Sequence, residues 1–490
     1  MAEVFVLDIG TRTIAGLILA SAEEGFEIRE ARLHQQLPGA MADGQIHHID
    51  AVASTIVKIK QELENACGRS FKTVAVAAAG RSLLTETGHG TLELVANQRL
   101  SPDQVRVLEL EAVRNAIEHL SCDQTQGVMH SYLCVGYSVI QYHLDGEPIG
   151  ALEGHQGRRV QVDIIATFLP RIVIDSLGTA LKQAGLDMAS LTLEPIAAMH
   201  VVVPPSMRML NIALVDVGAG TSDIAISAEG TVKGYGMVSY AGDAITKGIA
   251  DHFLLDFRVA EQVKVELQPG QISECQDVFG NTLRLSYQEV VAVMQPRVEI
   301  LAEKVAQAIN ELNGSTPKGA ILIGGGSRVP GFAASLAKHL GLPENLVRMR
   351  DRSSMEIVRG FPNFNGPEAI TPIGIGCTNL DRRAMELIHV TVNEQHLQFL
   401  NMASSTVGEA LVQAGLVPAE LVGRPGAAFT VELNGRCIPL PGTLGKPAVV
   451  KKNGEPCELG SPLADGDRLE VRPGEEGQPP RITLGELIDE

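Results

Sequence analysis

Two stretches about two hundred residues apart carry residues that could bind a phosphate group. Each reads as a strand that ends on an aspartate, a glycine turn and a second strand; the residues concerned are Asp8, Gly10 and Thr11 in residues 4–18, and Asp216, Gly218, Gly220 and Thr221 in residues 214–226. Glycines let backbone N–H groups approach a phosphate, because no Cβ stands in the way. An aspartate at the strand end can hold a hydrated magnesium ion beside that phosphate. One copy could be an ordinary glycine-turned hairpin, but two copies predict two related α/β domains facing one nucleotide.

The two hairpins resemble the paired phosphate loops of the actin-like ATPase superfamily, which includes actin, sugar kinases, DnaK-type chaperones and the bacterial proteins MreB, FtsA and PilM. Three more stretches match that superfamily in order: residues 194–198 are similar to its first connecting segment, 321–331 to its adenosine loop and 371–376 to its second connecting segment. The resemblance covers residues 1–380. It implies an α/β fold with duplicated actin-like (ribonuclease H-like) ATPase domains, and ATP with Mg²⁺ as cofactors.

The resemblance also implies roles for single residues. Glu194 would orient the attacking water, which must lie in line with the γ-phosphate; the alternative is that it only favours the positive end of a helix. Glu261 and Lys264 would contact the ribose; the alternative is an exposed helical ion pair. Asp8 and Asp216 would hold Mg²⁺ through water, and the catalytic set would be Glu194, Asp8 and Asp216. The other residues expected at the nucleotide are Gly10, Thr11, Arg12, Gly218, Gly220, Thr221, Gly242, Asp243, Gly324, Gly325, Gly326 and Ser327.

The elements that must position these residues follow from the spacing of apolar side chains. Strands are expected near residues 4–8, 14–20 and 26–33, and a helix near 50–66. The expected domains are a first actin-like domain in residues 1–84 and 166–203, an inserted subdomain in 85–165, a second actin-like domain in 204–384 with a small subdomain in 246–312, a C-terminal β-grasp-like domain in 385–474 and a tail in 475–490.

The inserted segment begins its helix at Ser101, with proline at the first position and Gln104 at the third, as a capping box would require. An insertion at this place is characteristic of FtsA and PilM, and residues 137–150 closely resemble FtsA. In that family the subdomain is a protein-docking and filament-contact surface. The alternative is an exposed ornament without a partner.

The resemblance to FtsA ends near residue 385. FtsA finishes with a linker and an amphipathic membrane helix, whereas this chain continues with strand-like runs, including a hairpin signal at Asn434–Gly435. Residues 465–471 look like the last strand of a ubiquitin-like domain. Sulfur carriers of that fold end in Gly-Gly, which this sequence lacks, so sulfur transfer is not expected. Residues 473–482, rich in Gly, Pro and Glu, are expected to be loose.

Composition excludes several classes of function. The seven cysteines form no Cys-x-x-Cys pair, which argues against a zinc site or a disulfide framework and suits a reducing cytosol. The net charge of −18, without a basic tract, argues against nucleic acid as a partner. No apolar run approaches the length of a transmembrane helix, and strand structure begins almost at the N-terminus, which leaves no room for a signal peptide.

These features predict a cytoplasmic, actin-like ATP-binding scaffold of bacterial cell division or envelope assembly, with slow hydrolysis and self-association left open. Its partners would be other division or envelope-assembly proteins, bound through residues 85–165 and the C-terminal domain. They would also recruit it to the inner face of the membrane, since no direct anchor is seen. One alternative is a non-hydrolysing adaptor, like PilM, that binds a peptide of a membrane partner. A chaperone or small-molecule kinase of the same superfamily is a further alternative.

Overall fold

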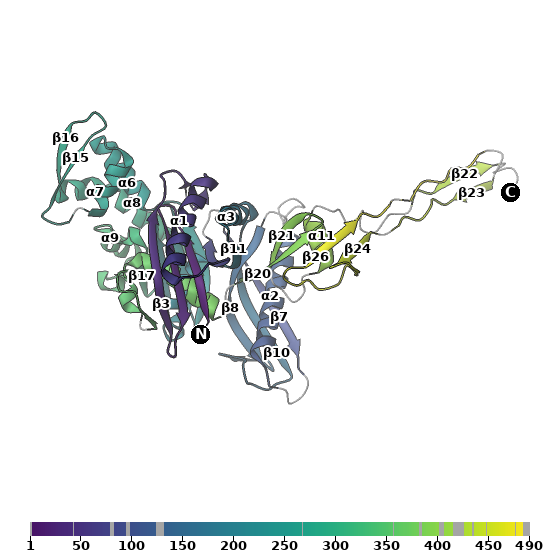
Figure 1. The fold of residues 1–490 in the computed structure, drawn as a ribbon. Helices are drawn as coiled ribbons and strands as arrows, with labels where there is room; N and C mark the ends of the chain where they lie inside the picture. Colours follow the sequence, from purple (N-terminus) through teal and green to yellow (C-terminus); the bar gives the residue numbers. More distant parts are fainter. Residues whose placement is uncertain are drawn as a thin grey trace. The chain divides into compact units, whose positions relative to one another are not determined.

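The computed structural model describes residues 2–42, 44–78, 83–94, 99–123, 132–266, 268–355, 357–381, 385–400, 406–414, 426–433, 436–446, 448–475 and 477–483. The chain forms two compact units, Met1–Met385 and Glu386–Glu490 (Figure 1). The hairpin turn predicted at residues 434–435 lies outside the described residues. None of the helices in the described ranges is long and apolar enough to cross a membrane.

The first unit contains two sheets of the same plan. In each, three antiparallel strands are followed by two strands that join in parallel, in the orders β3-β2-β1-β6-β11 and β14-β13-β12-β17-β18. The bounds in the first sheet are β1 Glu3–Ile9, β2 Thr13–Ser21, β3 Phe26–Gln35, β6 Thr73–Ala78 and β11 Asp187–Leu193, with β19 Val358–Arg359 added beside β3. Those in the second are β12 Ile212–Val217, β13 Ser222–Ala228, β14 Thr231–Val238, β17 Gly319–Ile323 and β18 Val347–Met349. The predicted duplication is confirmed.

Helices cover each sheet through apolar stripes. Helix α1 (Ile49–Cys67) buries Ile56 and Ile59 against β2, where Gly16 makes room, because a Cβ at that position would collide with Ile59. Helix α8 (Tyr287–Asn313) begins at a capping box between Ser286 and Glu289 and buries a stripe at helical spacing in the second core. Helix α9 (Phe332–Leu340) packs on α8, and α3 (Arg171–Gln183) packs on α1.

Two connecting helices join the halves of the first unit. They are α4 (Glu194–Val202) and α10 (Ile370–Leu380), and they cross closely because Gly374 has no side chain to collide with the carbonyl of Ala197. The second half also contains α6 Gly242–Phe253, α7 Phe257–Glu266, β15 Ile272–Gln276 and β16 Thr282–Ser286. Strands β15 and β16 pair with each other as an antiparallel hairpin.

The inserted subdomain is a sheet covered by one helix. Its strands follow the order β7-β10-β8-β9, and its elements are β7 Leu84–Glu93, α2 Pro102–Asp123, β8 Tyr132–Leu144, β9 Glu147–Ile149 and β10 Arg159–Pro170. The predicted capping box is present: the Ser101 N–H donates to Gln104 Oε1 at 3.0 Å, and the Gln104 N–H donates to Ser101 Oγ at 3.3 Å. The subdomain also touches the second half, since Ser138 Oγ and Tyr235 Oη lie 2.6 Å apart.

The second unit pairs its first and last long strands in parallel, as a β-grasp domain does. Strand β20 (Met385–Val392) lies beside β26 (Arg468–Arg472), and α11 (Val407–Gln413) packs on them through Leu411. The flanking strands are β21 Gln395–Leu400, β24 Val449–Lys452 and β25 Glu455–Pro456.

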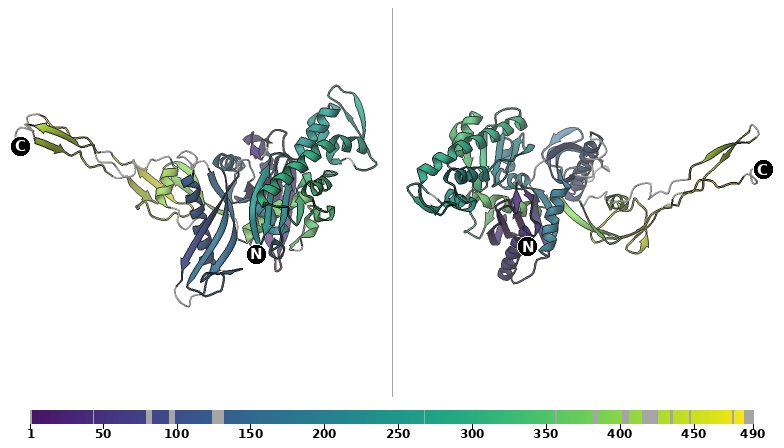
Figure 2. Two further views of the ribbon diagram at one scale, coloured as in Figure 1. Left: turned by 180° about the vertical axis from the view of Figure 1, so that it is seen from behind. Right: turned by 90° about the horizontal axis from the view of Figure 1, so that it is seen from above.

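A long ribbon, β22 (Phe429–Leu433) with β23 (Arg436–Leu440), extends from this β-grasp part in both views of Figure 2. The expectation that residues 473–482 are loose is wrong. The backbones of Lys446 and Glu475 exchange two hydrogen bonds of 2.9 and 3.0 Å, and the Thr443 N–H donates to the carbonyl of Gln478 at 2.9 Å. The Gly- and Pro-rich composition favours disorder only where no neighbouring segment bonds the chain, and here Thr443 and Lys446 do so.

Candidate functional site

The two phosphate loops are built on the same turn. The Gly10 N–H donates to the Thr13 carbonyl at 3.0 Å, and the Gly218 N–H donates to the Thr221 carbonyl at 2.9 Å. The sequence pattern grouped Thr11 with Thr221, but these hydrogen bonds make Thr13 the counterpart of Thr221. Asp8 and Asp216 then occupy the same place, two residues before each turn glycine.

A cleft of about 1050 Å³ lies between the two halves of the first unit. Most residues predicted for the site line it: Asp8, Gly10, Thr11, Arg12, Glu194, Asp216, Gly218, Thr221, Gly242, Glu261, Lys264, Gly324, Gly325 and Gly326. Gly220 and Asp243 instead line an adjoining pocket of about 340 Å³, which shares Arg12 with the cleft. Ser327 is buried behind the adenosine loop, where its hydroxyl donates to the Gly324 carbonyl at 2.6 Å.

The glycines of the adenosine loop allow it to lie against the second phosphate loop. Gly324 has a φ of +78°, and a Cβ there would collide with the Asp216 carboxylate. A Cβ at Gly326 would come within 2.6 Å of the Val217 side chain, whereas one at Gly325 would meet nothing within 4 Å. The loop continues as a 3₁₀ turn over Gly325–Arg328. Bare backbone at two of these three positions is therefore a packing requirement, and at the third it leaves open space.

Four carboxyl groups lie close together beneath the cleft, and three of them, Asp8, Glu194 and Asp216, line it. Burial, and then the charge of Asp216, raises the pKa of both Asp8 and Asp223 to about 7. Burial raises the pKa of Asp216 to about 6, although a hydrogen bond from Thr371 Oγ1 at 2.6 Å opposes the shift. Burial, followed by Asp8, Asp223 and Asp216, raises the pKa of Glu194 well above its usual range. The four acids therefore lack a compensating positive charge among the described residues.

Asp223 and Thr371 were missed in the sequence. Asp223 pairs with Asp216 across β12 and β13, and it accepts a hydrogen bond from Thr221 Oγ1 at 3.2 Å. Its signal was present, because strand alternation places residues 221 and 223 on one face. Thr371 lies 155 positions from Asp216 in the chain, and no local pattern announces that contact.

The donor set fits a hydrated divalent cation better than a directly ligated one. No three His, Cys, Asp or Glu side chains within the described ranges stand close enough to bind a metal directly. Magnesium commonly keeps several of its waters and takes one or two carboxylates. Asp8 and Asp216, at the strand ends beside the two loops, could hold such an ion through water, and its charge would offset the mutual repulsion of the four acids.

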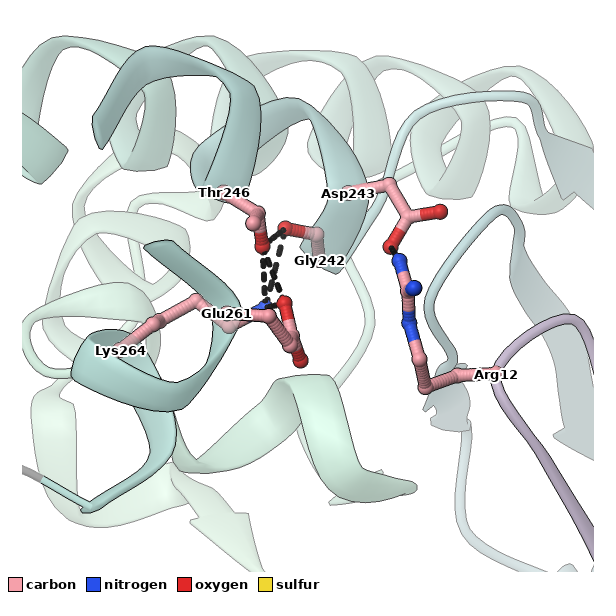
Figure 3. Close-up of polar contacts among 6 residues, drawn as sticks. All are labelled: Arg12, Gly242, Asp243, Thr246, Glu261 and Lys264. Carbon is pink, nitrogen blue, oxygen red and sulfur yellow. Dashed lines mark hydrogen bonds and ion pairs between the residues drawn. The ribbon is translucent and has the colours of Figure 1, made fainter. Parts of the chain in front are cut away.

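Helices α6 and α7 carry a second polar group in the cleft. Lys264 Nζ lies 2.7 Å from Glu261 Oε2 and 2.7 Å from Thr246 Oγ1, and it donates to the Gly242 carbonyl at 3.2 Å (Figure 3). Burial raises the pKa of Glu261, but Lys264 and Thr246 lower it more, so the net pKa lies below its usual value. The pair is thus a well-bonded unit beside the phosphate loops, and not the exposed helical ion pair that was the alternative.

Arg12 crosses from the first half to the second. Its Nη2 lies 2.5 Å from Asp243 Oδ1 (Figure 3). Its guanidinium stands 4.8 Å from the centre of the Phe257 ring. Its Nε is buried and has no partner in the described part of the chain. In this conformation Arg12 links the first phosphate loop to the first turn of α6 across the cleft, and Asp243 is its anionic partner.

Comparison with known proteins agrees with this geometry. The family model "Cell division protein FtsA" matches residues 213–393, which hold the second phosphate loop, the adenosine loop and the polar group of α6 and α7. The "Cell division protein FtsA" of Pseudomonas aeruginosa is 23% identical over 363 residues, covering 70% of this chain and 84% of that one. The "Cell division protein FtsA" of Bacillus subtilis is 23% identical over 422 residues, covering 82% of this chain and 90% of that one.

Among solved structures, the "PilM-PilN type IV pilus biogenesis complex" contains a chain similar in fold, with a TM-score of 0.56 and 17% identity, covering 76% of this chain and 98% of that one. The duplicated sheets, the paired loops and the inserted subdomain all belong to one architecture. The chain is therefore similar to FtsA in sequence and to an actin-like protein of the PilM–PilN complex in fold, and it carries a C-terminal strand-rich unit.

Proposed function

We propose that the chain binds ATP with Mg²⁺ in the cleft and hydrolyses it slowly, and that it acts as a cytosolic scaffold in bacterial cell division or envelope assembly. The observation that carries the proposal is the pair of equivalent turns at Gly10 and Gly218, which face one cleft beside four clustered carboxyl groups, two of which, Asp216 and Asp223, are buried. Anionic phosphates need N–H donors, and buried carboxylates need a cation. Mg·ATP supplies both complements at once.

Each part of the cleft would have one task. The phosphates would be held by the two loops, through Gly10, Thr11, Gly218, Gly220 and Thr221, with Arg12 near them. The nucleoside would lie against Gly324–Gly326, with Ser327 behind that loop, and beside Glu261 and Lys264. Gly242 and Asp243 would support the second loop, because their N–H groups donate to the carbonyls of Gly218 and Ala219 at 3.2 and 2.8 Å.

Glu194 would orient the attacking water from the first turn of α4. Burial and the neighbouring carboxyl groups raise the pKa of Glu194 well above its usual range, which favours the protonated form while the four acids face one another without a cation. A magnesium ion held by Asp8 and Asp216 through water would neutralise phosphate charge and favour the ionised form of Glu194. The ionised carboxylate accepts a hydrogen bond from water, which a protonated acid directs less well. Hydrolysis by this chain would therefore depend on the cation twice.

The scaffold role rests on two observations. The curated relatives named above are cell division proteins. In addition, the inserted subdomain contacts both halves of the unit: Gly136 lies against Ile196 of α4, and Ser138 contacts Tyr235 of β14. A change in closure of the cleft would move these contacts together, so a partner docked on the subdomain could read the nucleotide state.

A non-hydrolysing adaptor is the second candidate. It is favoured by the raised pKa that burial and the neighbouring acids give Glu194, and by the similarity in fold to a chain of the PilM–PilN complex. Such a protein would use nucleotide as a structural element and present a peptide-binding surface to a membrane partner.

ATP binding and turnover separate the two candidates. We would measure both with Mg²⁺ for the wild type, for Glu194→Gln and for the control Glu303→Gln, which changes an exposed glutamate on α8. An ATPase cycle run by Glu194 predicts tight binding in all three proteins, with turnover about 100-fold lower in Glu194→Gln only. Binding without turnover in all three would make the protein an adaptor. Absence of binding in the wild type would refute the proposed site.

A further inference from the structure

Gln36 stands directly behind the first phosphate loop. It follows β3, is 6% exposed and lines the cleft, yet none of the roles above involves it. Its backbone N–H donates to the Arg12 carbonyl at 2.9 Å. Its side-chain Nε2 donates to the Gly10 carbonyl at 2.6 Å and contacts Met41 Sδ at 3.1 Å. Two hydrogen bonds from one residue thus hold two carbonyl groups of the loop.

The orientation of this carboxamide is set by its partners. A carbonyl oxygen and a thioether sulfur can only accept, so the NH₂ end must face Gly10 and Met41. The opposite end, Oε1, is buried and has no donor in the parts of the chain that the structure describes. A buried acceptor left unpaired is costly, and that cost is tolerated where the group serves another purpose.

Fixing the Gly10 carbonyl also fixes the next N–H. In a trans peptide the C=O of one residue and the N–H of the following residue point in opposite directions. Because the Gly10 carbonyl points at Gln36, the Thr11 N–H points away from it. That N–H has no acceptor among the described residues, and Thr11 lines the cleft. The loop therefore offers an oriented, unpaired donor.

The second loop shows the same arrangement with a different support. There the Gly218 carbonyl accepts from the Gly242 N–H at 3.2 Å, at the start of α6. The Ala219 N–H then points away from α6, lines the cleft and likewise lacks an acceptor within the described ranges. In the first half the side chain of Gln36 occupies the place that a helix N-terminus occupies in the second.

We propose that Gln36 is the positioning residue of the first phosphate loop: it holds the Gly10–Thr11 peptide so that the Thr11 N–H meets a phosphate oxygen of a nucleoside di- or triphosphate. This role rests on the proposed nucleotide binding. Gln36 itself touches no phosphate. It acts by keeping the peptide from rotating, so that binding does not have to orient the donor first.

The test compares ligands with and without phosphates. Calorimetric titration with Mg·ATP and with adenosine would be run on the wild type, on Gln36→Met and on the control Gln183→Met, an exposed glutamine at the end of α3. Loss of one oriented donor to a charged oxygen predicts an affinity for ATP lower by about tenfold or more in Gln36→Met. The affinity for adenosine should be unchanged, and the control should match the wild type for both ligands.

A second variant provides rescue by protonation. In Gln36→Glu an ionised carboxylate would face the Gly10 carbonyl and repel it, whereas the protonated acid can donate to it. The ratio of wild-type to variant affinity for ATP should therefore be larger at pH 8 than at pH 5.5. This comparison carries the test if Gln36→Met does not fold.

Three outcomes would overturn the inference. An unchanged ATP affinity in Gln36→Met would show that the loop needs no support. An equal loss for ATP and adenosine would mean that Gln36 only stabilises the fold. A wild type that binds adenosine but gains nothing from phosphates would refute the proposed phosphate loops and this role with them, whereas normal wild-type binding with a normal variant would refute the role of Gln36 alone.

Discussion

Replacing Asp216 with asparagine should stabilise the nucleotide-free protein at alkaline pH. Burial raises the pKa of Asp216 from 3.8 to about 6. A carboxyl group with a raised folded-state pKa binds its proton more tightly when folded, so the free energy of unfolding falls as the pH rises from about 4 to about 6. At about 1.4 kcal/mol per pKa unit, the ionised Asp216 costs about 3 kcal/mol at pH 8. Asparagine cannot ionise and keeps nearly the same shape, so it avoids this cost.

The effect should extend to the neighbouring acids. The charge of Asp216 contributes to the raised pKa values of Asp8, Asp223 and Glu194, so its removal lowers all three. At pH 8 the gain should therefore be at least about 3 kcal/mol in the free energy of unfolding. For a unit the size of Met1–Met385 this corresponds to a rise in Tm of about 4 °C.

Thermal and urea unfolding at pH 4, 6 and 8, without nucleotide, would measure the difference. The control is Asp251→Asn, an exposed aspartate on α6, for which we expect no change at any pH. Wild type and Asp216→Asn should coincide at pH 4 and diverge as the pH rises. Added Mg²⁺ should narrow the gap at pH 8 by stabilising the wild type alone. An Asp216→Asn protein less stable than the wild type at pH 8 would refute the electrostatic reasoning, because it would mean that the ionised carboxylate already has a compensating partner.

Two further substitutions test the walls of the cleft. Gly324→Ala should lower the free energy of unfolding by more than about 3 kcal/mol, because the position combines a φ of +78° with a collision. Gly325→Ala, which faces open space, should be nearly neutral. Equal effects of the two substitutions in urea unfolding would contradict this account. Lys264→Met should cost about 3 kcal/mol and raise the pKa of Glu261, because it leaves a carboxylate that is 19% exposed without its cation, while the exposed Lys247→Met serves as control. Unchanged urea unfolding of Lys264→Met would show that the buried pair contributes nothing net to stability.

Much of the fold could be predicted because its signals are local. Each phosphate loop can be recognised within a dozen residues, since strand, aspartate and glycine turn follow one another without interruption. The helix start at Ser101 depends on three residues within four positions, and its two hydrogen bonds are present as expected. Where the chemistry of an element is contained in neighbouring residues, the sequence suffices.

What could not be predicted depends on distant contacts. Gln36 lies 26 positions from the carbonyl it holds, and Asp243 lies 231 positions from Arg12. The tail at Glu475 was misjudged for the same reason: its composition favours disorder, but it forms an isolated β-bridge with Lys446, which lies 29 positions away in the chain. The equivalence of Thr13 with Thr221 likewise required the hydrogen-bond pattern, because both Thr11 and Thr13 follow the glycine.

The two phosphate loops differ in charge at one pair of equivalent positions. Equivalent turns make Arg12 the counterpart of Gly220, so only the first loop carries a long side chain across the cleft. Gly220 lines the adjoining pocket with Arg12, and a second bulky cation there would compete for the same space and for the same Asp243 carboxylate. The first half therefore supplies the arginine of this contact, and the second half supplies the carboxylate. An interdomain contact of this kind exists only when the halves approach, which couples the geometry of both phosphate loops to closure. The asymmetry gives two similar domains a single closed arrangement, in which Gln36 supports one loop, α6 supports the other and Arg12 joins them.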